Sequence, residues 1–199
     1  MNRRLARDYM RLFCAILFVF LYIPHIFIAR LGRHRNDIIN DVEKMGPDSF
    51  GLTGLVGFLF LLHTDRYFRT LFYHRIGPFY SLLIGWWRPG DRYFIISKST
   101  KIGGGAYFAH PFSTIINATS IGKNFKCRNL TTIGNKIDGD NKNRPTIGDN
   151  VTLGVNVTII GSVHVGNNVT IGAGSVVVKD IPNNAIAVGN PATVVKYKV

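Results

Sequence analysis

Residues 147–177 read IGDNVTLGVNVTIIGSVHVGNNVTIGAGSVV, and this stretch decides the fold. An aliphatic residue recurs at every sixth position through it without a slip. Glycine follows four of these residues, and valine stands four positions after each of the first four. A fixed six-residue period of this kind predicts a parallel β-helix. The in-phase positions are Ile147, Leu153, Ile159, Val165, Ile171 and Val177.

The period has a simple physical basis. Three short strands make one coil of a triangular prism, so each aliphatic side chain points inward and stacks on its equivalent 18 residues later. Glycine, asparagine and aspartate tolerate the tight corners between strands. Each coil contacts only its neighbours, so the array needs several coils and capped ends. Similar fragments begin at Ile102, Ile121 and Ile133, and the coils are predicted to run from about residue 95 to 182, within a β-helix domain of residues 95–199.

The period is interrupted twice. Ile102, Phe108 and Ile115 show one extra residue beside His110 and Pro111, which we interpret as a bulge at a functional corner. Ile133 and Ile147 are separated by more than two periods, so the polar segment 135–145 is predicted to leave the prism as an extruded loop.

Residues 1–94 are predicted to form an apolar, helical region. Residues 12–28 carry no charge, but about 20 apolar residues are needed to span a bilayer. Both flanks are basic, which argues against a simple span and favours a re-entrant or interfacial helix on anionic headgroups. A cleaved signal peptide and a buried core helix are the alternatives. The basic flanks are Arg3, Arg4, Arg7 and Arg11, then Arg30, Arg33 and Arg35.

Two further apolar stretches, 50–62 and 76–87, are each too short to span. Aromatic side chains of the kind found at headgroup level stand within and before the second: Tyr73, Tyr80, Trp86 and Trp87. These stretches fit either membrane contact or a helical cap on the β-helix, and the two are compatible.

Charge and cysteine content limit the classes of partner and the compartment that are expected. The formal net charge of +13 is spread over both halves and suits a polyanionic ligand or an anionic membrane surface. Nucleic acid is not expected as a partner, since the chain contains no recognisable nucleic-acid-binding motif. Cys14 and Cys127 are too few and too differently placed for a disulfide framework, which favours a reducing compartment.

Three segments, 101–122, 144–182 and 188–196, resemble the serine acetyltransferase-like branch of the hexapeptide-repeat acyltransferases. The ending IGAGSVVVKDIP followed by GNPA is most similar to enzymes that O-acetylate capsular or extracellular polysaccharides. The resemblance implies a left-handed parallel β-helix, acetyl-CoA as acyl donor, no metal, and a homotrimer with active sites between adjacent prisms. Carried over by position, the CoA contacts are Gly154, Val155, Gly172, Ala173, Val178, Lys179, Gly189, Asn190, Pro191 and Lys196.

His110 matches the histidine that serves this family as general base, and such a base must lie within hydrogen-bond reach of the acceptor hydroxyl. His164, the other histidine in the coils, is expected at the surface. Serine acetyltransferases carry two aspartates and a second histidine where Ile95, Ala109 and Arg144 stand here. The resemblance therefore favours a saccharide acceptor, free or lipid-linked, over serine. Arg144 and Asn117 are the candidate substrate-binding residues.

Other functional classes fit less well. A non-catalytic β-helix scaffold predicts uniform repeats, without an extruded loop or the GNPA ending. A metal-dependent β-helix hydratase needs three histidine ligands, and the coils hold only two histidines. We therefore expect an O-acetyltransferase at the cytoplasmic face of the cell membrane, because CoA is cytosolic, with serine O-acetylation as the alternative.

Overall fold

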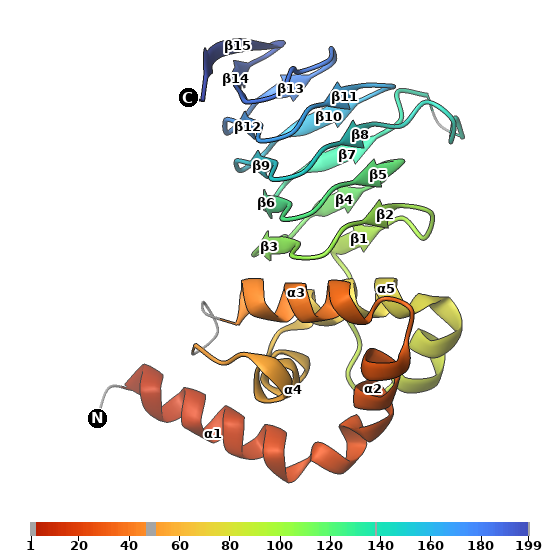
Figure 1. Ribbon diagram of the computed structural model, residues 1–199, viewed down its shortest axis with the longest axis vertical. Helices are drawn as coiled ribbons and strands as arrows, with labels where there is room; N and C mark the ends of the chain where they lie inside the picture. Colours follow the sequence, from red (N-terminus) through yellow and green to blue (C-terminus); the bar gives the residue numbers. More distant parts are fainter. Residues whose placement is uncertain (1–2, 47–50, 138, 199) are drawn as a thin grey trace. The chain divides into compact units, whose positions relative to one another are not determined.

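The computed structural model describes residues 3–46, 51–137 and 139–198 and divides into two compact units between Asp91 and Arg92 (Figure 1). Phe50 of the second apolar stretch and Asp138 of the predicted loop lie outside the described residues, as do the side chains of Arg3 and Arg4. We call the two parts the helical unit and the β-helix unit.

The helical unit contains five described helices. They are α1 (Arg3–Leu17), α2 (Val19–Leu31), α3 (Arg35–Met45), α4 (Gly54–Thr64) and α5 (Arg66–Ile84). Helix α5 begins sharply because the Asp65 carboxylate accepts hydrogen bonds from the backbone N–H groups of Tyr67 and Phe68. It kinks at Gly77, whose φ of 83° is left-handed, just before Pro78.

Helix α4 is the centre of the helical unit, since every residue from Gly57 to His63 is buried. Phe58 packs edge-on against Phe68 and Phe72 of α5. The apolar stretch around residues 54–62 is therefore a core helix. A buried ion pair joins α3 to α5, where Arg75 donates to both carboxylate oxygens of Asp41.

Helices α1 and α2 carry the long apolar segment at the N-terminal end of the described chain. Among the described residues, no single helix is long and apolar enough to cross a bilayer, while Ala6–Leu17 and Val19–Leu31, bent by 78°, meet that test only as a pair. The bend occurs at Phe18, between the two helices. Many apolar side chains of both helices are exposed, including Met10, Phe13, Phe20, Ile23, Phe27 and Leu31.

The β-helix unit is a left-handed parallel β-helix built of three sheets, as predicted (Figure 1). The first sheet contains β1 (Phe94–Ile96), β4 (Thr114–Ile116), β7 (Thr132–Gly134), β10 (Thr158–Ile160) and β13 (Val176–Val177). The second contains β2 (Lys101–Ile102), β5 (Ser120–Ile121), β8 (Thr146–Ile147) and β11 (His164–Val165). The third contains β3 (Tyr107–Ala109), β6 (Lys126–Arg128), β9 (Thr152–Leu153), β12 (Thr170–Ile171), β14 (Ala185–Gly189) and β15 (Ala192–Tyr197). All pairings between these strands are parallel except that of β14 with β15.

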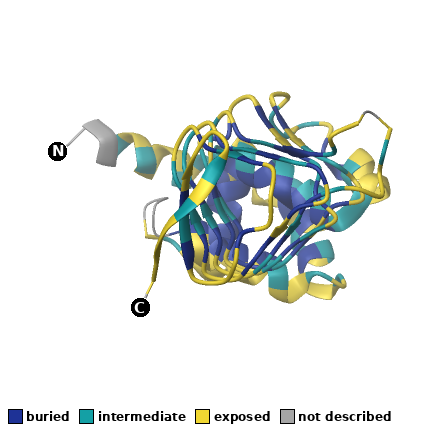
Figure 2. Ribbon diagram, turned by 90° about the horizontal axis from the view of Figure 1, so that it is seen from above, coloured by how far each residue is buried: buried dark blue, intermediate teal, exposed yellow. Residues whose placement is uncertain are grey.

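The six-residue period has the predicted physical cause. All six in-phase residues are buried, and each of the first three pairs with the residue 18 positions later: Ile147 with Val165, Leu153 with Ile171, and Ile159 with Val177. Buried and exposed residues accordingly alternate along the coils in Figure 2. Five corner asparagines adopt left-handed φ values of 56–60°, which asparagine tolerates well: Asn124, Asn150, Asn156, Asn168 and Asn184.

The predicted phase is wrong at one position. Ile115 is 46% exposed, whereas Ile116 is fully buried and pairs with Ile133 in the core. The insertion after Phe108 is therefore two residues, and the corner that leads to Ile121 is one residue shorter to compensate. A single-residue shift reverses the facing of a strand, so the sequence spacing alone misassigned Ile115.

Candidate active site

The corner between the third and first sheets brings together most of the predicted functional residues. We call it the His110 corner, and it comprises residues 110–113, 129–131, 154–157, 172–175 and 189–191 of successive coils. Because paired strands lie about 4.8 Å apart, the four steps from the first coil to the last span about 19 Å along this edge. The corner thus forms one line from His110 to the turn between β14 and β15.

His110 stands at the start of this line. It follows β3, is exposed, and has a left-handed φ of 51°. Its carbonyl oxygen accepts a hydrogen bond of 2.7 Å from the backbone N–H of Phe112, which closes the corner. Ser113 and Leu130 of the same corner are also left-handed, so the chain turns tightly along this edge. In the part of the chain that the structure describes, no hydrogen bond to the His110 ring is formed.

Backbone hydrogen bonds stack the corner segments on one another. Leu130 donates to the carbonyl of Phe112, Asn156 to that of Asn129, and Gly174 to that of Val155, at 2.9–3.0 Å. The last step is a bond of 3.2 Å from the backbone N–H of Gly189 to Oγ of Ser175. The line of small residues is therefore held rigidly relative to His110.

Gly154 shows why small residues occupy this corner. A Cβ at this position would lie 2.6 Å from the backbone nitrogen of Ala173 in the next coil. Stacking of the coils therefore explains this glycine fully. Gly189 is required for a different reason, since its φ of 105° leads into the turn with Asn190 and Pro191.

A second group of predicted residues lies at the corner between the first and second sheets. We call it the Arg144 corner, and its described residues are 117–119, 135–137, 139–145, 161–163 and 178–180. The chain leaves the first sheet after Gly134 and re-enters the second at Thr146. Nη1 of Arg144 donates to Oγ of Ser99 at 2.7 Å and to Oδ1 of Asn117 at 3.2 Å. The amide of Asn117 in turn donates to Oδ1 of Asn135 at 3.0 Å.

One chain therefore divides the predicted site between two corners. Val178 and Lys179 are exposed at the Arg144 corner, on the far side of the first sheet from His110. Lys196 is exposed on β15, where it pairs with Ile186. Within a single chain, His110 shares its edge with the glycines and Ala173 but not with Arg144, Asn117 or Lys179.

Two residues that the sequence analysis missed lie next to His110. Arg128 pairs with Ala109 in the third sheet and is exposed, and Asn129 follows at the corner. They stand one coil after the histidine, so counting one coil forward from His110 would have found them. A guanidinium and an amide beside an imidazole are groups that form hydrogen bonds with polar ligands.

Other chemistry-bearing groups lie apart from this edge. His164 is exposed on the second sheet, as expected. Cys14 and Cys127 are free thiols, and burial raises the pKa of Cys127 to about 12. Across the described residues, no three His, Cys, Asp or Glu side chains are grouped as a metal site requires.

Residues 144–179 match the family described as bacterial transferase hexapeptide (six repeats). A putative colanic acid biosynthesis acetyltransferase, WcaB, from Escherichia coli K12 is 43% identical over 100 residues, which are 50% of this chain and 61% of that protein. A serine acetyltransferase of Synechococcus elongatus is 33% identical over 101 residues, which are 50% of this chain and 41% of that protein. The chain thus spans less than two thirds of the length of the curated relatives that it matches.

Solved structures share the fold over most of the chain. Soybean serine acetyltransferase without ligand superimposes with a TM-score of 0.63 and 29% identity, covering 81% of this chain and 68% of that one. Serine acetyltransferase from Brucella abortus in complex with coenzyme A has a TM-score of 0.68 at 18% identity, covering 88% of this chain and 73% of that one.

Proposed function

We propose that this chain, which belongs to the hexapeptide-repeat transferase family, is an acetyl-CoA-dependent O-acetyltransferase that acts on a saccharide hydroxyl in capsular or exopolysaccharide biosynthesis. The observation that carries the proposal is the continuous edge from His110 to the Gly189 turn. It combines one exposed imidazole with the small residues Gly154, Gly172 and Ala173 of later coils, and a slender acyl carrier needs small residues to approach the backbone closely.

The chemistry follows from the position of His110. A ring nitrogen of His110 accepts the proton of the acceptor hydroxyl as that oxygen attacks the thioester carbonyl of acetyl-CoA. The acetyl–oxygen bond forms, the carbon–sulfur bond breaks, and the thiolate takes the proton back from the imidazolium. The pantetheine arm lies along Gly154, Val155, Gly172 and Ala173, and the Gly189–Asn190–Pro191 turn holds its far end.

The complete site is formed by two copies of the chain in a homotrimer. The division of the candidate residues between two corners supports this, because Lys179 and Arg144 meet His110 only if the Arg144 corner of a neighbour packs near the His110 corner. Exposed apolar side chains on the first sheet and beside His110 also support such packing. They are Tyr93, Ile95, Phe112, Ile115 and Leu130.

A saccharide is the proposed acceptor because groups suited to serine are missing. Ile95 and Ala109 stand where serine acetyltransferases carry carboxylates, and Ile95 is exposed on the first sheet, where it offers no charge to an amino group. The WcaB-like relative supports the same acceptor class. Serine remains the second candidate, favoured by the relatives at about one third identity and by the shared fold.

We also infer that the helical unit meets the cytoplasmic face of an anionic membrane. The support is the exposed apolar surface of α1 and α2 together with the arginines that flank it. This placement suits a lipid-linked saccharide as acceptor and keeps the active site in the compartment that holds CoA.

The deciding experiment measures thiol release from acetyl-CoA by the full chain with saccharide, sugar-nucleotide, lipid-linked saccharide and free serine acceptors. Turnover with a saccharide that disappears in His110→Ala supports the proposal. Efficient acetylation of free serine would replace the proposed acceptor, and absence of turnover with every acceptor would count against an O-acetyltransferase.

A further inference from the structure

We propose that a cavity between α2, α3 and α4 binds one anionic phospholipid, with its phosphate between Arg30 and Arg35 and an acyl chain in the apolar interior. The inference rests on the proposed membrane contact of the helical unit and names the lipid class and residues that would make that contact specific.

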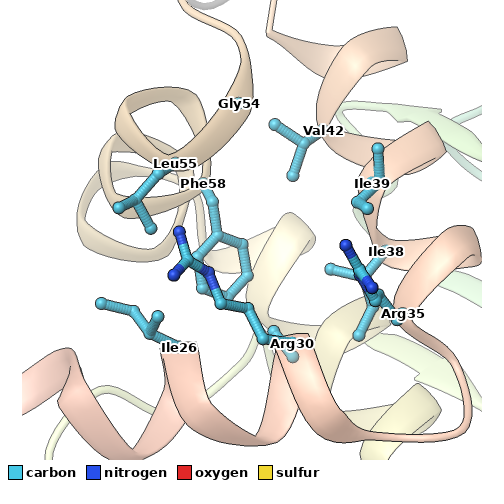
Figure 3. A pocket seen from close by; sticks show the side chains of 10 residues that line it. Ile26, Arg30, Arg35, Ile38, Ile39, Val42, Gly54, Leu55 and Phe58 are labelled. Atoms are coloured by element: carbon cyan, nitrogen blue, oxygen red, sulfur yellow. The ribbon is translucent and has the colours of Figure 1, made fainter.

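The cavity is about 270 Å³ in volume, close to the lower end of ligand-binding pockets. The described residues that line it are apolar except for the two arginines, which supply charge. Figure 3 shows the side chains of Arg30 and Arg35 extending from α2 and α3 over this apolar lining. The apolar lining includes Ile26, Ile38, Ile39, Val42, Leu55 and Phe58.

Neither arginine has an ion-pair or hydrogen-bond partner for its guanidinium among the residues that the structure describes. The nearby carboxylates of α3 are already engaged. Arg75 holds Asp41 in a buried bidentate pair and lies 3.7 Å from Asp37, which also contacts Nδ1 of His34 at 3.3 Å. The guanidinium groups of Arg30 and Arg35 therefore line the cavity without counter-charge from the described residues. Guanidinium groups bind phosphate oxygens in paired hydrogen bonds.

The backbone at the cavity favours an anion as well. Arg35 is the first residue of α3, and His34 before it makes no side-chain hydrogen bond that caps the helix. The N-terminus of a helix carries partial positive charge, which adds to the attraction of the two side chains. The carboxylate of Asp37 in the first turn offsets part of this charge, and the N–H of Arg35 already donates to the carbonyl of Gly32.

The ligand must carry an apolar chain, because the surface next to Arg30 and Arg35 is hydrophobic. A second hollow of about 350 Å³ shares Ile26 and Arg30 with the first and is otherwise lined by Ile23, Phe27 and Leu31. These last three side chains are 59–70% exposed and belong to the apolar surface proposed to enter the membrane interface. A free phosphate or a nucleotide would leave these walls uncovered, whereas a two-chain phospholipid covers both hollows.

The test is co-sedimentation of the full chain with vesicles of phosphatidylcholine containing phosphatidylglycerol, compared with phosphatidylcholine alone. The double variant Arg30→Gln/Arg35→Gln is matched in charge by Arg7→Gln/Arg33→Gln, whose residues are exposed and lie outside the cavity. We expect the first to bind anionic vesicles about tenfold more weakly than the second. Equal loss in the two variants would show unspecific attraction and overturn the site.

Two further measurements keep charge, shape and folding apart. Ile39→Trp obstructs the half-exposed mouth of the cavity without changing charge, and we expect it to weaken binding as well.

A water-soluble short-chain phosphatidylglycerol should raise the melting temperature of the wild type but not of Arg30→Gln/Arg35→Gln. Inorganic phosphate should not raise the melting temperature of either protein. Stabilisation by inorganic phosphate to the same degree would point to a soluble anion and contradict the lipid. His110→Ala should slow acetyl transfer by about 10²- to 10⁴-fold and leave lipid binding intact, so failure of either proposal is recognised separately.

Discussion

Arg144 and Asn117 are joined by a hydrogen bond of 3.2 Å across 27 residues of sequence, from the end of the extruded loop to the coil beneath it. The guanidinium also donates from Nε to the carbonyl of Asn141 within the loop and from Nη1 to Ser99. Arg144 therefore holds the end of the loop against the prism.

Replacing Arg144 should loosen the loop before it harms the coils. We expect Arg144→Ala to raise the KM for the acceptor several-fold and to speed limited proteolysis within residues 136–143, with little change in melting temperature, because the lost bonds are largely exposed. Steady-state kinetics measures the KM, and limited digestion with a protease other than trypsin measures the rate of cleavage in the loop. Lys142→Ala, in the same loop but outside this hydrogen-bond set, is the control, and an equal response from it would contradict the role of Arg144.

Removing His110 should act on the chemical step. We expect His110→Ala to reduce kcat/KM for acetyl transfer by about 10²- to 10⁴-fold without changing the melting temperature, since the side chain is exposed. His164→Ala removes the other histidine of the coils and should retain full activity. Comparable losses in the two variants would exclude His110 as the base.

Gly154 should not tolerate a methyl group. A Cβ there would lie 2.6 Å from the backbone nitrogen of Ala173, and neither neighbour can move without displacing a coil. Overpacking of this kind costs about 1–3 kcal/mol, so we expect Gly154→Ala to melt about 4 °C or more below the wild type. Gly134→Ala is the matched control, because a Cβ at that buried glycine meets nothing within 4 Å. If both variants melt like the wild type, close coil stacking is not what requires Gly154.

Ile115 should be central to trimer formation if the first sheet is the interface. An arginine at this exposed position of the sheet would bring three charges together, so we expect Ile115→Arg to sediment as a monomer and lose acetyl transfer. Ser120→Arg adds the same charge to the second sheet and should remain trimeric. Sedimentation velocity decides between these outcomes, and a trimeric Ile115→Arg would place the interface elsewhere.

Acid should destabilise the helical unit selectively. Burial lowers the pKa of His25 to about 4, and burial with the nearby charge of Arg88 lowers the pKa of His63 to about 4. Between pH 6.5 and about 4 the unfolded chain binds protons that the folded unit does not. The free energy of unfolding is therefore highest above pH 6.5 and falls as the pH is lowered through this range. Denaturant unfolding followed by tryptophan fluorescence reports this unit alone, because Trp86 and Trp87 both lie in it.

Two variants test that assignment. His25→Phe removes one of the titrating groups from a site where the ring stacks on Phe72, and it should flatten the pH dependence. His164→Gln alters an exposed histidine of the β-helix unit and should leave the dependence unchanged. An unaltered slope in His25→Phe would mean that other groups govern the acid response.

The β-helix was predictable because its information is local and repeated. One aliphatic residue in six suffices to place Leu153 and Ile171 in the core, and the same rule carries through the later coils. The rule fails beside His110, where the corner is two residues longer than the regular period and the next corner is one residue shorter. There the core residue is Ile116 rather than Ile115, and only the strand register distinguishes the two.

The candidate site was predictable only in part. The sequence resemblance identified His110 and the small residues, but not that Lys179 and Arg144 lie at a different corner from His110. Arg128 and Asn129 belong to no sequence motif. They lie near His110 only because the coils stack. In the helical unit, the pairing of Asp41 with Arg75 spans 34 residues and has no local periodicity that could reveal it.

The antiparallel hairpin of β14 and β15 has a further consequence for a protein built of parallel coils. A row of identical strands offers an unpaired edge at its end, and another solenoid could add to that edge indefinitely. Strand β15 runs against the direction of the coils and covers the edge of the third sheet, while β13 and β11 at the ends of the other two sheets are only two residues long. The hairpin thus limits end-to-end association of the solenoids into fibres, and its turn is the one proposed to hold the acyl donor.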